Sequence, residues 1–308
     1  MTSSGSPAAP AAFDRAAYLA RIGYGGPLAP TLPTLRALHR AHLLAVPFEN
    51  LDIHLGRPIV LDVDALYRKI VVARRGGFCY ELNGLFAALL RDLGFAVTLL
   101  SAGVARAGGG FGPEFDHLTL RVDLGEPWLA DVGFGALFIE PLRLDTAGEQ
   151  PDGESVFRLA ADGEGRILRR RDRDPAAPWT DEYRCTPRPR ALADYAAMCR
   201  YHQTSPASTF THKRTCSRLT PTGRVTLSER QLIVTTDGRR EERPVTGDAE
   251  HRALLREHFG ITLPALPWRD PLAAPLTTDD RRQTTDDWRP PCPARRSPCG
   301  SATSTAAR

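Results

Sequence analysis

Apolar positions in the first third of the chain repeat at helical spacing. One such stretch, over 34–46, begins at a threonine suited to cap a helix, and a second runs over 64–72. The clearest repeat lies between residues 82 and 93, where apolar residues recur three and four positions apart until Gly94 ends the pattern. We therefore predict a helical domain over 13–94.

Beyond this region the pattern changes from helical spacing to alternation. Apolar residues occupy every second position over 118–124 with polar residues between them, which is typical of a half-buried strand. A turn near Gly125 and a second β segment over 128–133 complete a hairpin. With the short β segments that follow, we predict a β-barrel domain over 95–189. The three arginines at 169–171 are interpreted as a solvated sheet edge rather than a binding patch.

The next part of the chain mixes the two patterns. Helical spacing recurs over 191–201 and 248–259, and two short apolar β segments lie between them, at 225–227 and 232–235. This combination predicts a third domain, of α/β type, over 190–275.

The two ends of the chain have the composition of segments that cannot bury a core. Residues 1–12 are mostly Ser, Gly, Pro and Ala, and residues 276–308 are rich in Thr, Asp, Arg and Pro. We predict a disordered leader and a disordered tail. From residue 277 on, six arginines against four aspartates give +2 of the total net charge of +4, so the charge gives no indication of nucleic-acid binding.

Composition and cysteine usage narrow the class of protein. With 308 residues, 42% hydrophobic and 25% charged, the chain is expected to be globular. It contains no apolar run of about 18 residues and no secretory signal at its start, so we expect a cytoplasmic protein without a membrane contact. The six cysteines form no CxxC pair, which argues against a disulfide framework and against a metal site.

One of these cysteines, Cys79, stands where chemistry is expected. It follows two glycines and Phe78, and it opens the strongest helical repeat in the sequence. The positive end of the helix dipole lowers the pKa of a thiol at that position and favours the thiolate. The alternative is that Cys79 is a small buried core residue, the usual role of a lone cysteine.

The predicted hairpin supplies two partners for such a thiol. A turn near residue 125 places His117 and Asp131 directly opposite each other or one diagonal step apart, on the same face. Asp131 lies among apolar residues, where a carboxylate needs a partner, and it can fix the imidazole tautomer. Without Cys79 the pair would be interpreted as a solvent-exposed hairpin pair. With it, the three residues predict a Cys-His-Asp nucleophilic triad.

Five segments, in order along the chain, resemble the arylamine N-acetyltransferase family. They are VPFENLD at 46–52, RGGFCYELNG at 75–84, DHL at 116–118, DVGFG at 131–135 and YHQTSPASTF at 201–210. The resemblance extends from about residue 18 to residue 267. It implies an α+β fold with an N-terminal helical domain, a β-barrel middle domain and an α/β lid around a papain-like, cysteine-protease-type core.

The resemblance also implies a reaction. Cys79 would attack the thioester of acetyl-coenzyme A, the co-substrate, and a small aromatic amine or hydrazine would then take the acetyl group, as in xenobiotic metabolism. His117 would transfer the protons and Asp131 would orient it, with ping-pong kinetics. The backbone N–H of Cys79 is a reasonable oxyanion donor. We interpret Arg75 and Glu49 as a structural ion pair rather than a catalytic one.

Further positions are assigned only through the resemblance. Those implied to contact coenzyme A are Gly133, Gly135, Tyr201 and Thr209, and those implied to line the acceptor pocket are Phe48, Phe134 and Phe210. The alternatives are a tight strand exit for the glycines, a core or cap role for Tyr201 and Thr209, and ordinary core packing for each phenylalanine. The sequence departs from the family pattern at Ala136, where a second glycine is common.

Other functions remain open at this point. The first alternative is an amide synthase that releases a carrier-bound polyketide, a role of some members of the family. A cysteine hydrolase is disfavoured by the segment at 201–210 and by the glycine loop that contains Gly133 and Gly135. A non-catalytic binding protein would require an unreactive Cys79. The natural acceptor, the preferred acyl donor and the oligomeric state, including a homo-oligomer, are not determined by the sequence.

Overall fold

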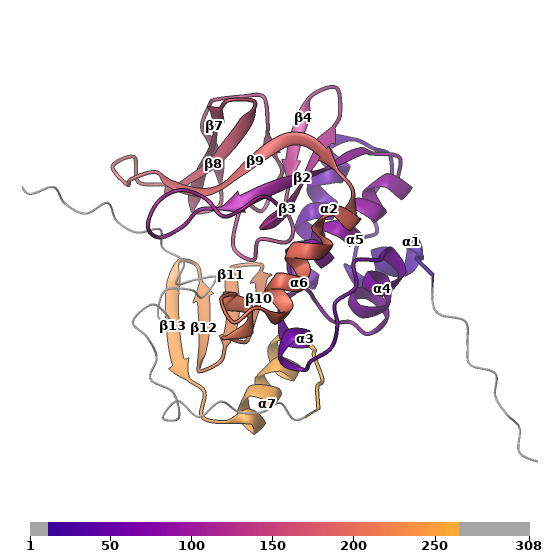
Figure 1. Cartoon of the computed structure of the whole chain (residues 1–308), viewed down its shortest axis with the longest axis vertical. Coiled ribbons are helices and arrows are strands. Elements are labelled where there is room, and N and C mark those ends of the chain that lie inside the picture. Colours follow the sequence, from indigo (N-terminus) through magenta and orange to yellow (C-terminus); the bar gives the residue numbers. More distant parts are fainter. Residues whose placement is uncertain (1–11, 265–308) are drawn as a thin grey trace, which may run out of the picture.

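The N-terminal helices surround one long buried helix, α5 (Cys79–Asp92), in the computed structural model, which describes residues 12–264 (Figure 1). The other helices of this part are α1 (Arg15–Arg21), α2 (Leu32–Ala45), α3 (Leu51–His54), α4 (Val63–Tyr67) and a π-helical turn (Arg68–Val72). The predicted leader, except for residue 12, and the predicted tail at 276–308 lie outside the described residues.

Helix α5 is buried because apolar residues occupy most of its circumference. Leu82, Leu85 and Leu89 are fully inaccessible to solvent, and helix α4 and strands of the neighbouring sheet pack around them. At its start, the Glu81 carboxylate accepts a hydrogen bond from the backbone N–H of Phe78 at 3.1 Å. The predicted cap of α2 was wrong by one turn: the Thr31 side chain, not that of Thr34, accepts the capping hydrogen bond.

The middle of the chain forms an eight-stranded antiparallel sheet in the order β5-β4-β3-β2-β9-β8-β7-β6. Its strands are β2 (Ala96–Val104), β3 (His117–Asp123), β4 (Pro127–Ala130), β5 (Leu142–Arg143), β6 (Gln150–Asp152), β7 (Ser155–Asp162), β8 (Gly165–Asp172) and β9 (Thr180–Arg190). The Gln150 side chain accepts from the Arg143 N–H at 2.6 Å and donates to its carbonyl at 3.0 Å. These bonds connect the two edge strands, so the sheet is nearly closed and the barrel-like middle region is confirmed.

The arginines at 169–171 do not form a solvated edge, so that prediction was wrong. Their strand, β8, lies inside the sheet between β7 and β9. Arg171 is 8% exposed, its guanidinium lies 5.1 Å from the centre of the Trp179 ring, and it pairs with Glu149 at 2.8 Å. These partners lie outside β8, and they allow the positive charge to be buried.

The last described part forms a second, five-stranded antiparallel sheet in the order β1-β10-β11-β12-β13, covered by α7 (Asp248–Phe259). Its strands are β1 (Phe48–Glu49), β10 (Thr215–Thr220), β11 (Gly223–Ser228), β12 (Gln231–Thr236) and β13 (Arg239–Pro244). The predicted β segments and the helix at 248–259 are confirmed. Three further strands were not predicted, among them β1, which pairs Phe48 with Ser217 and so connects the N-terminal part to this sheet.

Between the two sheets lies α6 (Ala196–Thr204), preceded by a 3-10 turn (Leu192–Tyr195) and followed by a second one (Thr209–Thr211) (Figure 1). The helix predicted over 191–201 is therefore divided, and its α-helical part ends three residues later than predicted. Within residues 12–264, no helix is long and apolar enough to cross a membrane.

Candidate active site

The structure places Cys79 as the first residue of α5, against the start of β3. The next residue, Tyr80, holds this arrangement: its hydroxyl donates to the carbonyls of Phe115 and Asp116, at 2.7 and 3.1 Å. The backbone of Leu118 forms a hydrogen bond with the Cys79 thiol. The thiol therefore lies beside the segment of β3 that carries His117.

His117 and Asp131 are hydrogen-bonded to each other. In the β3–β4 register Leu120 lies opposite Ala130, so the residue just after β4 is one diagonal step from His117 and on its face. Nε2 of His117 donates to Oδ2 of Asp131 at 2.7 Å. Because Nε2 carries this hydrogen bond, Nδ1 is the imidazole atom left to exchange a proton with another group. The hairpin geometry expected from the sequence is confirmed.

Asp131 is 1% exposed and receives further hydrogen bonds through its other oxygen. Oδ1 accepts from Nδ2 of Asn83 at 2.8 Å and from the backbone N–H of Gly133 at 3.0 Å. Burial alone would raise the pKa of Asp131, but His117 and these donors outweigh burial, so its pKa lies below the ordinary value. Asp131 is thus held as a carboxylate.

Two residues in this arrangement, Asn83 and His39, were not predicted from the sequence. Besides donating to Asp131, Asn83 donates to the Leu118 carbonyl at 2.7 Å and accepts from the Val132 N–H at 2.9 Å. Nδ1 of His39 donates to the Ile139 carbonyl at 2.7 Å, and its Nε2 accepts from the backbone N–H of Asp131 at 3.0 Å. Burial lowers the pKa of His39, so this imidazole acts as a neutral support.

Aromatic rings enclose the imidazole of His117. The ring centre of Phe134 lies 5.1 Å from that of His117 in an edge contact, and the ring centre of Tyr183 lies 5.3 Å away. His117 is itself 2% exposed. The two rings restrict its rotation and exclude water from the His117–Asp131 hydrogen bond.

The Cys79 thiol differs from the sequence expectation in its acidity. Cys79 is 4% exposed, and burial raises the pKa of its thiol well above the ordinary value, with smaller contributions in the same direction from Asp131 and Asp116. The Leu118 hydrogen bond opposes the increase but does not cancel it. The helix-dipole argument underestimated burial, and a thiolate here requires a base that takes the proton.

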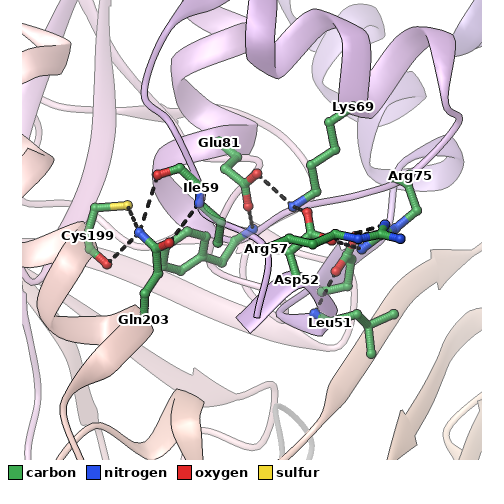
Figure 2. A network of polar contacts seen from close by, with 11 residues as sticks. Leu51, Asp52, Arg57, Ile59, Lys69, Arg75, Glu81, Cys199 and Gln203 are labelled. Atoms are coloured by element: carbon green, nitrogen blue, oxygen red, sulfur yellow. Dashed lines mark hydrogen bonds and ion pairs between the residues drawn. The ribbon is translucent and has the colours of Figure 1, made fainter. Parts of the chain in front are cut away.

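A network of buried charges fixes the segment that leads into α5 (Figure 2). Lys69 pairs with Glu81 at 2.7 Å and with Asp52 at 2.8 Å. Arg75 pairs with Glu49 at 2.8 Å and with Asp52 at 3.0 Å, so the predicted Arg75–Glu49 ion pair is confirmed. We call these five residues the charge network. Because Glu81 also caps Phe78, the network determines where α5 begins and therefore where Cys79 lies.

The glycine loop, which follows Asp131 and contains Gly133 and Gly135, contacts Cys79 and one strand of each sheet. A Cβ atom at Gly133 would lie 2.8 Å from Cα of Cys79, so only glycine fits there. Arg224 of β11 donates to the carbonyl of Gly135, whose φ is 94°, and Arg170 of β8 donates to that of Ala136 at 3.4 Å.

The remaining predicted residues fall into two groups. Phe210 packs on Phe48 and on Phe78, the residue before Cys79, with ring centres 6.3 and 5.6 Å apart. Tyr201 and Thr209 lie on the exposed side of α6 and the turn after it, and the described contacts do not join them to Gly133 or Gly135. Their neighbour Gln203 accepts from the Ile59 N–H at 2.7 Å, which attaches α6 to the N-terminal part (Figure 2).

Comparisons with known proteins agree on one family. A family model described as N-acetyltransferase matches residues 31–267. The chain is 36% identical over 250 residues to an arylamine N-acetyltransferase of Escherichia coli, covering 79% of this chain and 87% of that one. It is also 35% identical over 251 residues to the proansamycin X synthase of Amycolatopsis mediterranei, covering 79% and 95%.

A solved structure supports the same relationship. The arylamine N-acetyltransferase of Mycobacterium marinum in complex with CoA superposes with a TM-score of 0.74 at 34% identity. The match covers 80% of this chain and 93% of that one. The similarity therefore extends over most of the length of these relatives, and the residues matched by the family model, 31–267, include α5 and all the strands of both sheets.

Proposed function

The chain belongs to the arylamine N-acetyltransferase family and is an acyltransferase, and from its site we propose that it transfers an acetyl group from acetyl-coenzyme A to an arylamine or arylhydrazine. The observation that carries the proposal is the His117–Asp131 pair, hydrogen-bonded at 2.7 Å, together with the hydrogen bond from the backbone of Leu118, the residue after His117, to the Cys79 thiol. The M. marinum relative in complex with CoA supports the choice of donor.

The proposed first step loads the enzyme. Nδ1 of His117 takes the proton of the Cys79 thiol, whose pKa is raised by burial, and the sulfur attacks the carbonyl carbon of the thioester. The carbon–sulfur bond to coenzyme A breaks, and His117 returns the proton to the departing thiolate. The backbone N–H of Cys79 is the proposed donor to the oxyanion of the tetrahedral intermediate.

The proposed second step unloads the enzyme. An amine attacks the acetyl-Cys79 carbonyl, the bond to the Cys79 sulfur breaks, and the proton of the amine passes through His117 back to sulfur. Throughout, the Asp131 carboxylate keeps the proton of the imidazole on Nε2 and stabilises the imidazolium. Because coenzyme A leaves before the amine reacts, the scheme predicts ping-pong kinetics.

The positions assigned to substrates through the family resemblance remain proposals. We assign Phe48, Phe134 and Phe210 to the walls of the acceptor pocket, and Phe134 and Phe210 pack on His117 and Phe78, next to the reacting atoms. Gly133 and Gly135 are assigned to the donor channel, and Gly133 lies directly against Cys79, since a Cβ atom there would be 2.8 Å from Cα of Cys79. Tyr201 and Thr209 are assigned to its exposed outer part.

A donor and acceptor panel tests the proposal. Initial rates of coenzyme A release are measured with several acyl-coenzyme A donors against arylamines, arylhydrazines and alkylamines. Release that depends on an aromatic acceptor, with parallel double-reciprocal plots, is the expected result. Release that is independent of the acceptor would show hydrolysis instead and would contradict the proposal.

The second candidate function is an amide synthase acting on a carrier-bound polyketide. It is favoured by the proansamycin X synthase of A. mediterranei, which is as similar to this chain as the arylamine N-acetyltransferases are. A carrier-bound aryl-polyketide thioester is therefore added to the panel. If that thioester loads Cys79 while acetyl-coenzyme A does not, the second function replaces the first.

A further inference from the structure

A pocket lies apart from the catalytic residues, where the C-terminal ends of α1, α2 and α7 meet. Its wall includes residues 20–23, Ala45 and residues 256–260, together with Arg74 and Arg218 of β10. None of the residues assigned to the reaction is part of this wall. Four arginines line the pocket, whereas among its lining residues within 12–264 the only acidic one is Glu257.

Two of the four arginines support the fold. Arg21 donates to the carbonyls of Ala45 and Ile70, at 2.9 and 3.1 Å. Arg218 donates to the carbonyls of Leu44 and His258, at 2.8 and 2.6 Å. These carbonyls belong to helix ends, which carry only partial negative charge. In the described part of the chain neither guanidinium has a carboxylate partner, so much of their positive charge is not neutralised.

The other two arginines, Arg74 and Arg256, have no polar side-chain partner in the part of the chain that the structure describes. Over residues 12–264, the side chains of Arg74 and Arg256 form no ion pair and no hydrogen bond, and Glu257 lies 3.7 Å from Nε2 of His258. Nε of Arg218 is buried and has no acceptor in the same part of the chain. Burial, and then the charges of Arg74 and Arg218, lower the pKa of Arg21 to about 10. The pocket thus has an excess of positive charge and an unused donor.

We propose that this pocket binds a small molecule through a phosphoryl group. A phosphoryl group carries nearly two negative charges and three acceptor oxygens, which matches the two guanidinium groups and the one N–H that have no partner within residues 12–264. Arginine is suited to this task because its planar guanidinium presents parallel donors to phosphate oxygens. The proposal does not depend on the proposed function, because it involves none of the catalytic residues.

Calorimetric titration of the full chain with inorganic pyrophosphate, at constant ionic strength, tests the site. One saturable binding event is expected, and R74Q/R256Q should weaken it by about tenfold or more. Neither arginine has an ion-pair partner among the described residues, so this variant is expected to fold as the wild type does, which circular dichroism checks. The matched control is R143Q/R239Q, which also removes two positive charges, from β5 and β13, and should bind as the wild type does.

Two further arms separate the site from the catalytic cleft and identify the source of the phosphoryl group. Protein alkylated at Cys79 should bind pyrophosphate unchanged. Competition by coenzyme A would mean that its phosphates occupy the pocket, and absence of competition would mean a free phosphorylated metabolite. The proposal is overturned if the wild type shows no saturable binding, if R74Q/R256Q binds as tightly as the wild type, or if alkylation of Cys79 abolishes binding.

Discussion

Two buried polar networks meet at the start of α5, and they are constructed in opposite ways. The charge network joins Lys69 and Arg75 directly to three carboxylates, with every ion pair between 2.7 and 3.0 Å. The other, which we call the triad network, holds a single carboxylate, Asp131, and surrounds it with hydrogen-bond donors that carry no fixed charge.

The difference explains why chemistry is expected on only one side. The charges of the charge network are paired with one another, and Glu81 links them to the Phe78 N–H, so the network fixes the backbone. This holds although burial raises the pKa of Glu81 to about 7 against the opposing charge of Lys69. In the triad network His117 and the Cys79 thiol are both able to gain or lose a proton, and Asp131 sets which nitrogen does so. Changes in the triad network should therefore reduce the rate, and changes in the charge network should reduce stability.

The largest effect is expected for Cys79→Ala. Because the covalent intermediate cannot form, acetyl transfer should fall by roughly four orders of magnitude or more, while the melting temperature changes little. Steady-state coenzyme A release measures the rate. The matched control is Cys216→Ala, which removes another buried thiol, from β10, and should retain activity. Comparable activity in the two variants would contradict the role of Cys79.

The second-largest loss of rate is expected for Asp131→Asn. The variant keeps the shape of the side chain, but its amide N–H₂ would face Nε2 of His117. The imidazole proton would then move to Nδ1, and a protonated Nδ1 cannot accept the proton of the thiol. The rate should fall by roughly three to four orders of magnitude. The rate of Cys79 alkylation near neutral pH should fall as well. A wild-type alkylation rate would show that the hydrogen bond is only structural.

For the charge network we expect a loss of stability instead. Lys69→Met leaves Glu81 and one oxygen of Asp52 without their cation, which should cost about 3–5 kcal/mol in the free energy of unfolding, measured with urea. Arg15→Met, which breaks an exposed pair with Asp92, should cost about 1 kcal/mol or less. K69M/E81Q should recover part of the loss. Equal costs for the buried and the exposed pair would contradict the comparison.

A buried carboxylate outside both networks, Glu182, provides a test based on pH. Glu182 is fully buried, and burial raises its pKa to about 7 although Arg170 at 2.7 Å lowers it. The folded state therefore binds the proton more tightly than the unfolded state, so the resulting stabilisation is complete below pH 4.5 and is lost as the pH rises through 7. In the wild type, the free energy of unfolding should therefore fall by about 2 kcal/mol between pH 5 and 8 because of this group, and Glu182→Gln should remove that decrease. The measurement is urea unfolding at several pH values, and the same pH dependence of the unfolding free energy in both proteins would contradict the raised pKa of Glu182.

The smallest effect concerns the glycine loop. Arg224→Gln removes the donor to the Gly135 carbonyl without touching the triad network, so kcat should change little. If the loop borders the donor channel, KM for acetyl-coenzyme A should rise by about three- to tenfold. Arg239→Gln, on exposed β13, is the control. A decrease in kcat with an unchanged KM would place Arg224 with the triad network instead.

The sequence predicted those parts of the site that depend on local geometry. Cys79 was found because two glycines precede a strong helical repeat, and His117 and Asp131 because hairpin parity places them on one face. Asn83 and His39 contact Asp131 over 48 and 92 positions of sequence, which no local pattern encodes. A signal existed for Asn83, since it lies one helical turn after Cys79 on α5.

The fold shows the same limit. The apolar repeat of α5 and the alternation of β3 identify them without their neighbours, whereas every residue of β13 is exposed and β10 shows no clear alternation. Both are strands because β12 and β11 provide hydrogen-bond partners. Arg171 was misjudged because its burial depends on Trp179 and Glu149, which reach it only once the sheet has formed and which no periodic pattern links to it. The domain boundaries and the papain-like core stay predictions.

Direct observation of the acyl-enzyme tests the central claim. The protein is mixed with acetyl-coenzyme A without an acceptor, quenched in acid, digested and examined by mass spectrometry. We predict one acetyl group on the peptide that contains Cys79, and its loss within the turnover time once an arylamine is added. An unmodified Cys79 peptide from protein that releases coenzyme A with the amine present would contradict the account.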